Sequence, residues 1–179
     1  MKKAFTMLEL IIVVVVIGII AAAMIPRLQG SQLKKDVVVL VSKIRYTQHL
    51  ALVDKKFDPS QQNWFRNRWQ IVFGTHSYTI VSNNNTTYAI DPITHQPINN
   101  IELKGVKTIT LSGGCAGSDR ITFDAMGRPL IKDISSMTTP YVASGNNGEL
   151  LPSQCSITLS DGSISRTITI EPETGYVSY

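Results

Sequence analysis

The feature that most constrains this chain is an apolar run near its N-terminus, residues 5–25. The run contains one charged residue, Glu9, and two lysines, Lys2 and Lys3, precede it. At about 1.5 Å per residue, a helix of this length spans roughly 30 Å, the thickness of a bilayer's hydrocarbon core. Basic residues before the run predict a cytoplasmic N-terminus and an exported remainder. A carboxylate in such a segment is costly, so Glu9 is expected to need a partner.

The start of the run carries a motif, Ala4-Phe5-Thr6-Met7-Leu8-Glu9-Leu10. It resembles the prepilin processing site of type IV pilins and type II secretion pseudopilins. The resemblance implies that a prepilin peptidase cleaves between Ala4 and Phe5, and that the new amine of Phe5 becomes N-methylated. It also implies that Glu9 pairs with the N-terminal amine of a neighbouring subunit during filament assembly.

The match to the family pattern has one departure and two further points of agreement. The family usually has glycine before the cut, where this chain has Ala4. Alanine is also small, so cleavage is still expected. Gly18 and Pro26 fall where the family tends to place a glycine and a helix-kinking proline. Residues 1–4 are therefore expected to be a leader peptide, and residues 5–25 a transmembrane and assembly helix.

An ordinary secretory signal peptide is the alternative explanation of the N-terminus. Residues 10–20 could form its apolar region, and the alanines at 21–23 offer a small-residue cleavage site. The two possibilities differ in the first residue of the mature protein, which is Phe5 after prepilin processing and Met24 after signal cleavage.

From Pro26 to residue 54 the pattern becomes amphipathic, which predicts that the helix continues with one face packed on a domain. Pro26 lacks a backbone donor and clashes with the preceding turn, so a kink or local opening is expected there. The predicted packing face consists of positions three and four residues apart: Leu33, Val37, Leu40, Val41, Ile44, Gln48, Ala51 and Leu52.

Residues 55–179 are predicted to form an exported, β-rich globular domain. Alternating patterns separated by turn residues indicate antiparallel strands. A helix followed by such strands predicts an α+β fold. The expected strands cover residues 68–73, 76–81, 87–90, 107–111, 120–124, 128–131, 155–160 and 164–170, with a last short strand within residues 174–179.

The domain also resembles minor pseudopilins of the H type and related minor pilins. The matching segments are residues 69–73, residues 123–129, and residues 168–170 followed by 174–177. This resemblance implies a pilin-like fold with two packed sheets against the helix. It implies a subunit of a type II secretion pseudopilus for protein export, in the bacterial inner membrane with a periplasmic domain. Its partners would be other pilins or pseudopilins, an inner-membrane assembly platform and the lipid bilayer. The alternative is a minor type IV pilin in DNA uptake or adhesion.

The chain has two cysteines, Cys115 and Cys155, and both lie in the predicted exported domain. An oxidising compartment allows them to form a disulfide. Two buried free thiols remain the alternative. Neither cysteine has the neighbouring partner that a zinc pattern requires.

Nothing in the sequence marks an enzyme, a cofactor site or a metal site. The three histidines, His49, His76 and His95, form no ligand pair at metal-binding spacing. No nucleophile motif of the GxSxG type and no phosphate-binding GxxxxGK[ST] pattern occurs. A structural protein is therefore expected.

One basic and aromatic cluster could contact nucleic acid through Trp64, Arg66 and Arg68. Proteins commonly hold single-stranded nucleic acid with arginines that contact phosphates and aromatic rings that stack on bases. The alternative places Trp69 in the core and leaves the two arginines solvated. The net charge is +4, and it falls to +2 when Lys2 and Lys3 are removed with the leader, which does not by itself suggest nucleic acid, so DNA is not an expected partner.

Overall fold

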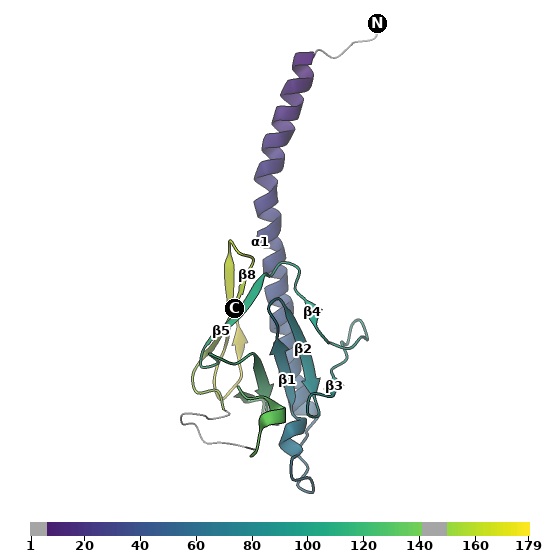
Figure 1. Cartoon of the computed structure of the whole chain (residues 1–179), viewed down its shortest axis with the longest axis vertical. Helices are drawn as coiled ribbons and strands as arrows, with labels where there is room; N and C mark the ends of the chain where they lie inside the picture. The colour runs from purple at the N-terminus through teal and green to yellow at the C-terminus, as the bar shows by residue number, and fades with distance from the viewer. Residues whose placement is uncertain (1–6, 141–149) are drawn as a thin grey trace.

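The computed structural model describes residues 7–140 and 150–179, with the backbone but not the side chains of residues 22–31. One long helix, α1 (Met7–Val53), dominates the shape (Figure 1). Its N-terminal half projects alone, and its C-terminal half runs along a β-rich domain. The helix continues through Gly18 and Pro26, so the local opening expected at Pro26 is absent. A bend at Pro26 stays a prediction.

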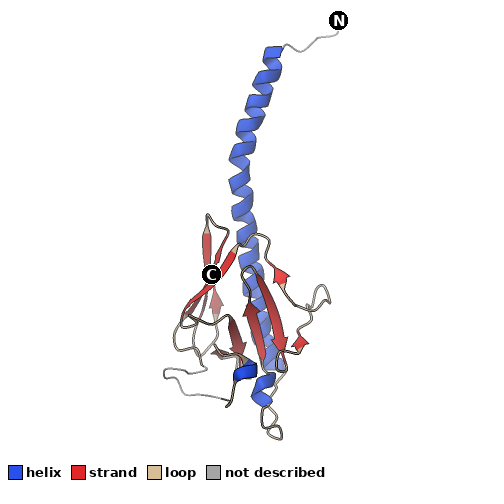
Figure 2. Ribbon diagram, viewed as in Figure 1, coloured by secondary structure: helices blue, strands red, loops and turns tan. Residues whose placement is uncertain are grey.

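The domain contains two antiparallel sheets (Figure 2). The first has the strand order β3-β2-β1-β6-β7, with β4 also paired to β2. Its strands are β1 (Trp69–Phe73), β2 (Ser77–Ser82), β3 (Thr87–Tyr88), β4 (Ile101–Glu102), β6 (Arg120–Phe123) and β7 (Pro129–Leu130). The second has the order β10-β9-β8-β5, formed by β5 (Thr108–Gly113), β8 (Cys155–Ser160), β9 (Ser165–Ile170) and β10 (Val177–Ser178). Two short 3-10 helices, η1 (Trp64–Asn67) and η2 (Ile134–Ser136), complete the domain.

The predicted α+β fold with antiparallel strands is confirmed. The two clearest hairpins, β1–β2 and β8–β9, form as expected from their alternating residues and short turns. The two-residue strand β4 lies in a stretch that carried no strand signal. The strand β5 pairs with β8 rather than with β4 or β6, its neighbours in sequence. The pairing runs from Thr108 opposite Ser160 to Gly113 opposite Cys155.

The amphipathic half of α1 fills the space between the two sheets. It contacts β1 and β6 of the first sheet and β8, β9 and β10 of the second. Burial of each large aliphatic side chain there contributes about 1.5–3 kcal/mol. Leu52, however, is 42% exposed, so its predicted place on the packing face is wrong. The buried apolar positions of the helix are Leu33, Val37, Leu40, Val41, Ile44 and Ala51.

Polar side chains of α1 also tie the helix to the loops of the domain. The carboxylate of Asp36 accepts a hydrogen bond from the Gly105 N–H at 2.6 Å. The Gln48 amide donates to the carbonyls of Gly127, at 2.9 Å, and Thr174, at 3.0 Å. These contacts explain why a glutamine lies on the packing face, because its amide N–H groups supply hydrogen bonds to two loop carbonyls.

Candidate functional site

The projecting part of α1 is the most unusual surface of the molecule. The large apolar side chains from Met7 to Ile20 are all 46–82% exposed. They lie on every side of the helix, whereas a surface helix of a globular protein has one apolar face. An apolar surface of this extent marks a site that another apolar surface covers. Within the described part of the chain, no helix is both long and apolar enough to cross a membrane.

Glu9 is the acidic residue in the first turn of α1, and it is exposed. A carboxylate there interacts favourably with the partial positive charge of the helix N-terminus, by about 0.3–1 kcal/mol. Ala4 and Phe5, the predicted cleavage and methylation residues, lie outside the described residues. The geometry between Phe5 and Glu9 therefore stays a prediction.

Gly18 lies within the same apolar surface. A Cβ built on Gly18 would meet no atom within 4 Å. The fold of this chain therefore does not require glycine at position 18. A packing role for Gly18 would have to come from a neighbouring helix, because small residues let two helices approach closely.

The first 25 residues match the prokaryotic N-terminal methylation motif. The family model of that description covers residues 1–25, which are the predicted leader and the apolar run. The match supports a type IV pilin-like precursor that a prepilin peptidase processes. No curated protein and no solved structure matches the chain.

The two cysteines form a disulfide between the ends of paired strands. Cys115 follows β5 and Cys155 begins β8, with their Cα atoms 5.1 Å apart. Both side chains are completely buried. The predicted disulfide is therefore present, and the alternative of two free thiols is wrong for this structure. An oxidised pair agrees with an exported domain.

The basic and aromatic cluster faces the protein rather than solvent. Arg68 is only 3% exposed, and its guanidinium lies 5.1 Å from the ring centre of Trp64. The Arg66 side chain donates to the Met137 carbonyl at 2.9 Å. Trp69 is core, as the alternative expected, and its indole donates to Asp54 at 3.0 Å. Burial of Arg68, which neither possibility foresaw, leaves Trp64, Arg66 and Arg68 without the exposed arginine row that a phosphate backbone needs.

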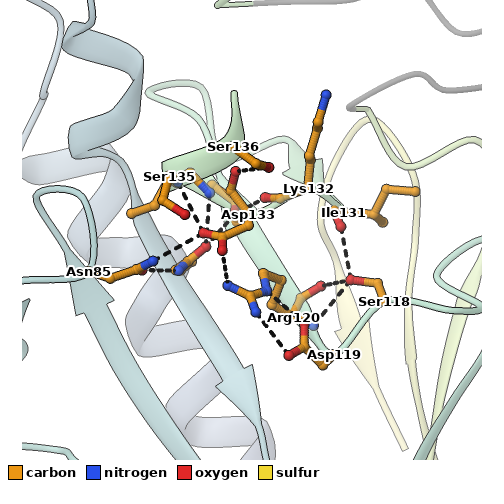
Figure 3. A network of polar contacts seen from close by, with 12 residues as sticks. Asn85, Ser118, Asp119, Arg120, Ile131, Lys132, Asp133, Ser135 and Ser136 are labelled. Carbon is orange, nitrogen blue, oxygen red and sulfur yellow. Dashed lines mark hydrogen bonds and ion pairs between the residues drawn. The ribbon is translucent and has the colours of Figure 1, made fainter. Parts of the chain in front are cut away.

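A polar network on the outer face of the first sheet was not predicted (Figure 3). Arg120 lies between two carboxylates, with its guanidinium 2.6 Å from Asp119 and 2.8 Å from Asp133. Asp133 also accepts hydrogen bonds from the Asn85 amide and the Ser135 N–H. The network joins β6, the β2–β3 turn and η2, three segments that are distant in sequence.

Electrostatics in this network favour the charged forms. Burial alone would raise the pKa of Asp133, but the hydrogen bonds from Ser135 and Asn85 and the charge of Arg120 outweigh it and lower that pKa. The hydrogen bond and charge of Asp119 correspondingly raise the pKa of Arg120. The network therefore holds η2 and the β2–β3 turn on the sheet, and its charges are satisfied within it.

The histidines do not converge in the described structure. His49 lies exposed on α1, His76 lies 4.0 Å from Glu102, and His95 sits in a turn with a positive φ of 56°. Among residues 7–140 and 150–179, no three His, Cys, Asp or Glu side chains gather closely enough to hold a metal ion.

Proposed function

We propose that this chain is a pilin-like structural subunit whose N-terminal helix is its assembly device. One observation carries the proposal: apolar side chains cover every side of α1 from Leu10 to Ile20, directly after Glu9 and within the matched methylation motif. A bilayer can cover this surface before assembly, and helices of neighbouring subunits can cover it afterwards. Both environments are apolar, so transfer between them costs little hydrophobic free energy.

In this proposal a prepilin peptidase removes residues 1–4 and the new N-terminus, Phe5, is methylated. Residues 5–25 anchor the subunit in the bacterial inner membrane, with the N-terminus cytoplasmic and the domain in the periplasm. Glu9 then neutralises the N-terminal amine of a neighbouring subunit in the helix bundle. Pairing is required because one unpaired charge buried in an apolar bundle is strongly destabilising.

We assign the subunit to a type II secretion pseudopilus that serves protein export. The resemblance of residues 69–73 and 123–129 to minor pseudopilins supports this assignment. The burial of Arg68 speaks against a DNA-uptake role through the Trp64 cluster. The other pseudopilins and the inner-membrane assembly platform are the proposed partners.

The processing step is tested by the mass and N-terminal residue of the protein from membranes of cells that express a prepilin peptidase. The expected protein begins at N-methylated Phe5. Ala4→Glu should leave the leader attached, because a charged side chain replaces a small one at the cut. A mature protein that begins at Met24 would show signal-peptide cleavage and overturn the proposal.

The assembly step is tested with Glu9→Ala in cells that carry the complete assembly machinery. The variant should remain in the membrane fraction and be processed, but be lost from sheared filaments. Val14→Ala is the matched control, since it changes the same helix without changing its charge. Filaments with normal Glu9→Ala content would refute the role of Glu9.

A further inference from the structure

Five exposed basic residues lie toward the end of the domain from which α1 projects, among them Arg166, which lies opposite Leu159 near the β8–β9 turn. We call them the basic collar: Lys34, Lys35, Lys104, Lys107 and Arg166. The first two lie on α1. Lys104 precedes Gly105, whose N–H donates a hydrogen bond to Asp36 of α1. Lys104 therefore lies near the turn of α1 that contains Lys34 and Lys35.

The β8–β9 hairpin completes the collar. The Lys107 backbone donates to the Ser160 carbonyl at 2.7 Å. The Lys107 side chain reaches the hairpin turn, with its Nζ 3.0 Å from where a Cβ on Gly162 would lie. Figure 1 shows the tip of this hairpin beside α1, at the end of the domain nearest the projecting half. Ile164, 44% exposed, lies in the same turn.

Three acidic groups lie near the collar and offset part of its positive charge. Asp36 is buried against Gly105. The Asp161 carboxylate accepts hydrogen bonds from the backbone of Ser163 and Ile164 within its own turn. These bonds, together with the charge of Lys107, lower the pKa of Asp161. Glu102 lies 4.0 Å from His76.

The collar differs from the basic residues at the other end of the domain. There, Lys56 pairs with Asp54 at 2.7 Å. Within the described residues, no side chain of the collar forms an ion pair. With five basic residues against Asp36, Glu102 and Asp161, positive charge is in excess at the end of the domain from which α1 projects.

We infer that the basic collar docks the domain on anionic phospholipid headgroups while the subunit waits in the membrane. The inference rests on the proposed anchoring of residues 5–25. Lys34 follows Ile25 by a helical rise of about 14 Å. The headgroup layer accounts for roughly 5–8 Å of that distance. The remaining distance is within one screening length, about 8 Å at physiological salt, so the attraction is effective and salt-sensitive.

Anionic lipid fits this surface better than a protein partner. The collar residues come from α1 itself, the β4–β5 connection and the β8–β9 hairpin, at the end of the domain from which α1 projects. A bilayer that holds the apolar half and contains anionic lipid presents a plane of negative charge to this end of the domain. Docking would hold the subunit in one orientation before it is extracted into a filament.

The test uses the full mature chain in vesicles whose lipids carry bromine near the headgroup end of the acyl chain. Ile164→Trp introduces a reporter at the hairpin tip. The native Trp64 and Trp69, in the distant half of the domain, serve as the unquenched internal reference. Vesicles contain either phosphatidylcholine alone or an added third of phosphatidylglycerol.

The reporter should be quenched in the anionic vesicles, and the quenching should disappear in phosphatidylcholine or at 0.5 M salt. Lys104→Gln with Lys107→Gln should lower the ratio of docked to free domain by roughly 25-fold, about fivefold for each lysine. Lys55→Gln, at the opposite end, removes one charge and should leave the quenching unchanged, whereas Lys104→Gln alone should lower the ratio about fivefold. Near-ultraviolet circular dichroism confirms that each variant is folded.

Flotation of the vesicles separates two kinds of failure. A chain that does not float with vesicles refutes the membrane anchoring, and the docking with it. A chain that floats but shows an unquenched reporter refutes docking alone. Quenching that is equal in neutral lipid, or insensitive to salt, refutes the role of the collar's charges.

Discussion

Reduction of the Cys115–Cys155 disulfide should strongly destabilise the domain. The bond joins residues 40 positions apart. Closing a segment of that length lowers the entropy of the unfolded chain by an amount that corresponds to about 4 kcal/mol. Domains of this size are stable by only about 5–15 kcal/mol, so this is a large fraction of the total.

The position of the disulfide adds a second expectation. Both cysteines belong to the β5–β8 edge of the second sheet, whereas the segment between them contains β6 and β7 of the first. β6 pairs with β1 at the centre of the first sheet, with Ile121 opposite Ile71. Loss of the bond should therefore lower amide protection in β6 as well as in β8.

The assay is urea unfolding of the full chain in detergent, with and without reductant, followed by circular dichroism. With a slope of about 2 kcal/mol per molar urea, a loss of about 4 kcal/mol moves the midpoint down by roughly 2 M. The Cys115→Ala/Cys155→Ala variant is the control and should not respond to reductant. A shift below about 0.5 M in the wild type, or an equal shift in the control, would contradict the reasoning.

Two further changes test the packing of α1 and the outer network. Gly105→Ala should destabilise the domain by about 1–3 kcal/mol in the same urea assay, because the new Cβ would lie 2.7 Å from the backbone nitrogen of Leu33. Gly18→Ala is the control and should not change the stability, because the Cβ there has open space. Equal losses of stability in the two variants would contradict this account. Asp133→Asn should cost about 1 kcal/mol at pH 7. Since the folded pKa of Asp133 is lowered, its contribution is present above the unfolded pKa, about 4, and is lost as pH falls through the folded value. The stability gap between wild type and Asp133→Asn should therefore close at acid pH, and a gap unchanged at pH 3 would refute the assigned charge.

Features that depend on neighbouring residues could be predicted from the sequence. The helix stripe from Leu33 to Ala51 follows from residues three and four apart, and the β8–β9 hairpin from alternation on both sides of Asp161 and Gly162. The prediction was wrong at Leu52, the last predicted position, which lies one residue before the end of α1 and is 42% exposed.

Features that depend on distant partners could not be predicted in the same way. Alternation shows that residues 108–113 form a strand, but it does not say which strand lies beside it. Arg68 is charged and next to a loop, so solvation was expected; its burial depends on Trp64 of η1 and on Met137, 69 positions away. Asp133 carried no signal, because its partners Asn85 and Arg120 come from other turns and strands.

Some features of the candidate site were likewise predictable from neighbouring residues, and others depended on distant ones. The sequence by itself determined the apolar run, Glu9 within it and the methylation motif, because all three are contiguous and their chemistry depends on spacing along one helix. The tertiary structure alone decided that the run projects away from the domain and that Cys115 bonds to Cys155. It also decided that basic residues from α1, the β4–β5 connection and β9 lie toward one end of the domain. These depend on how two sheets close around α1, and that packing is set by contacts between residues far apart in the chain.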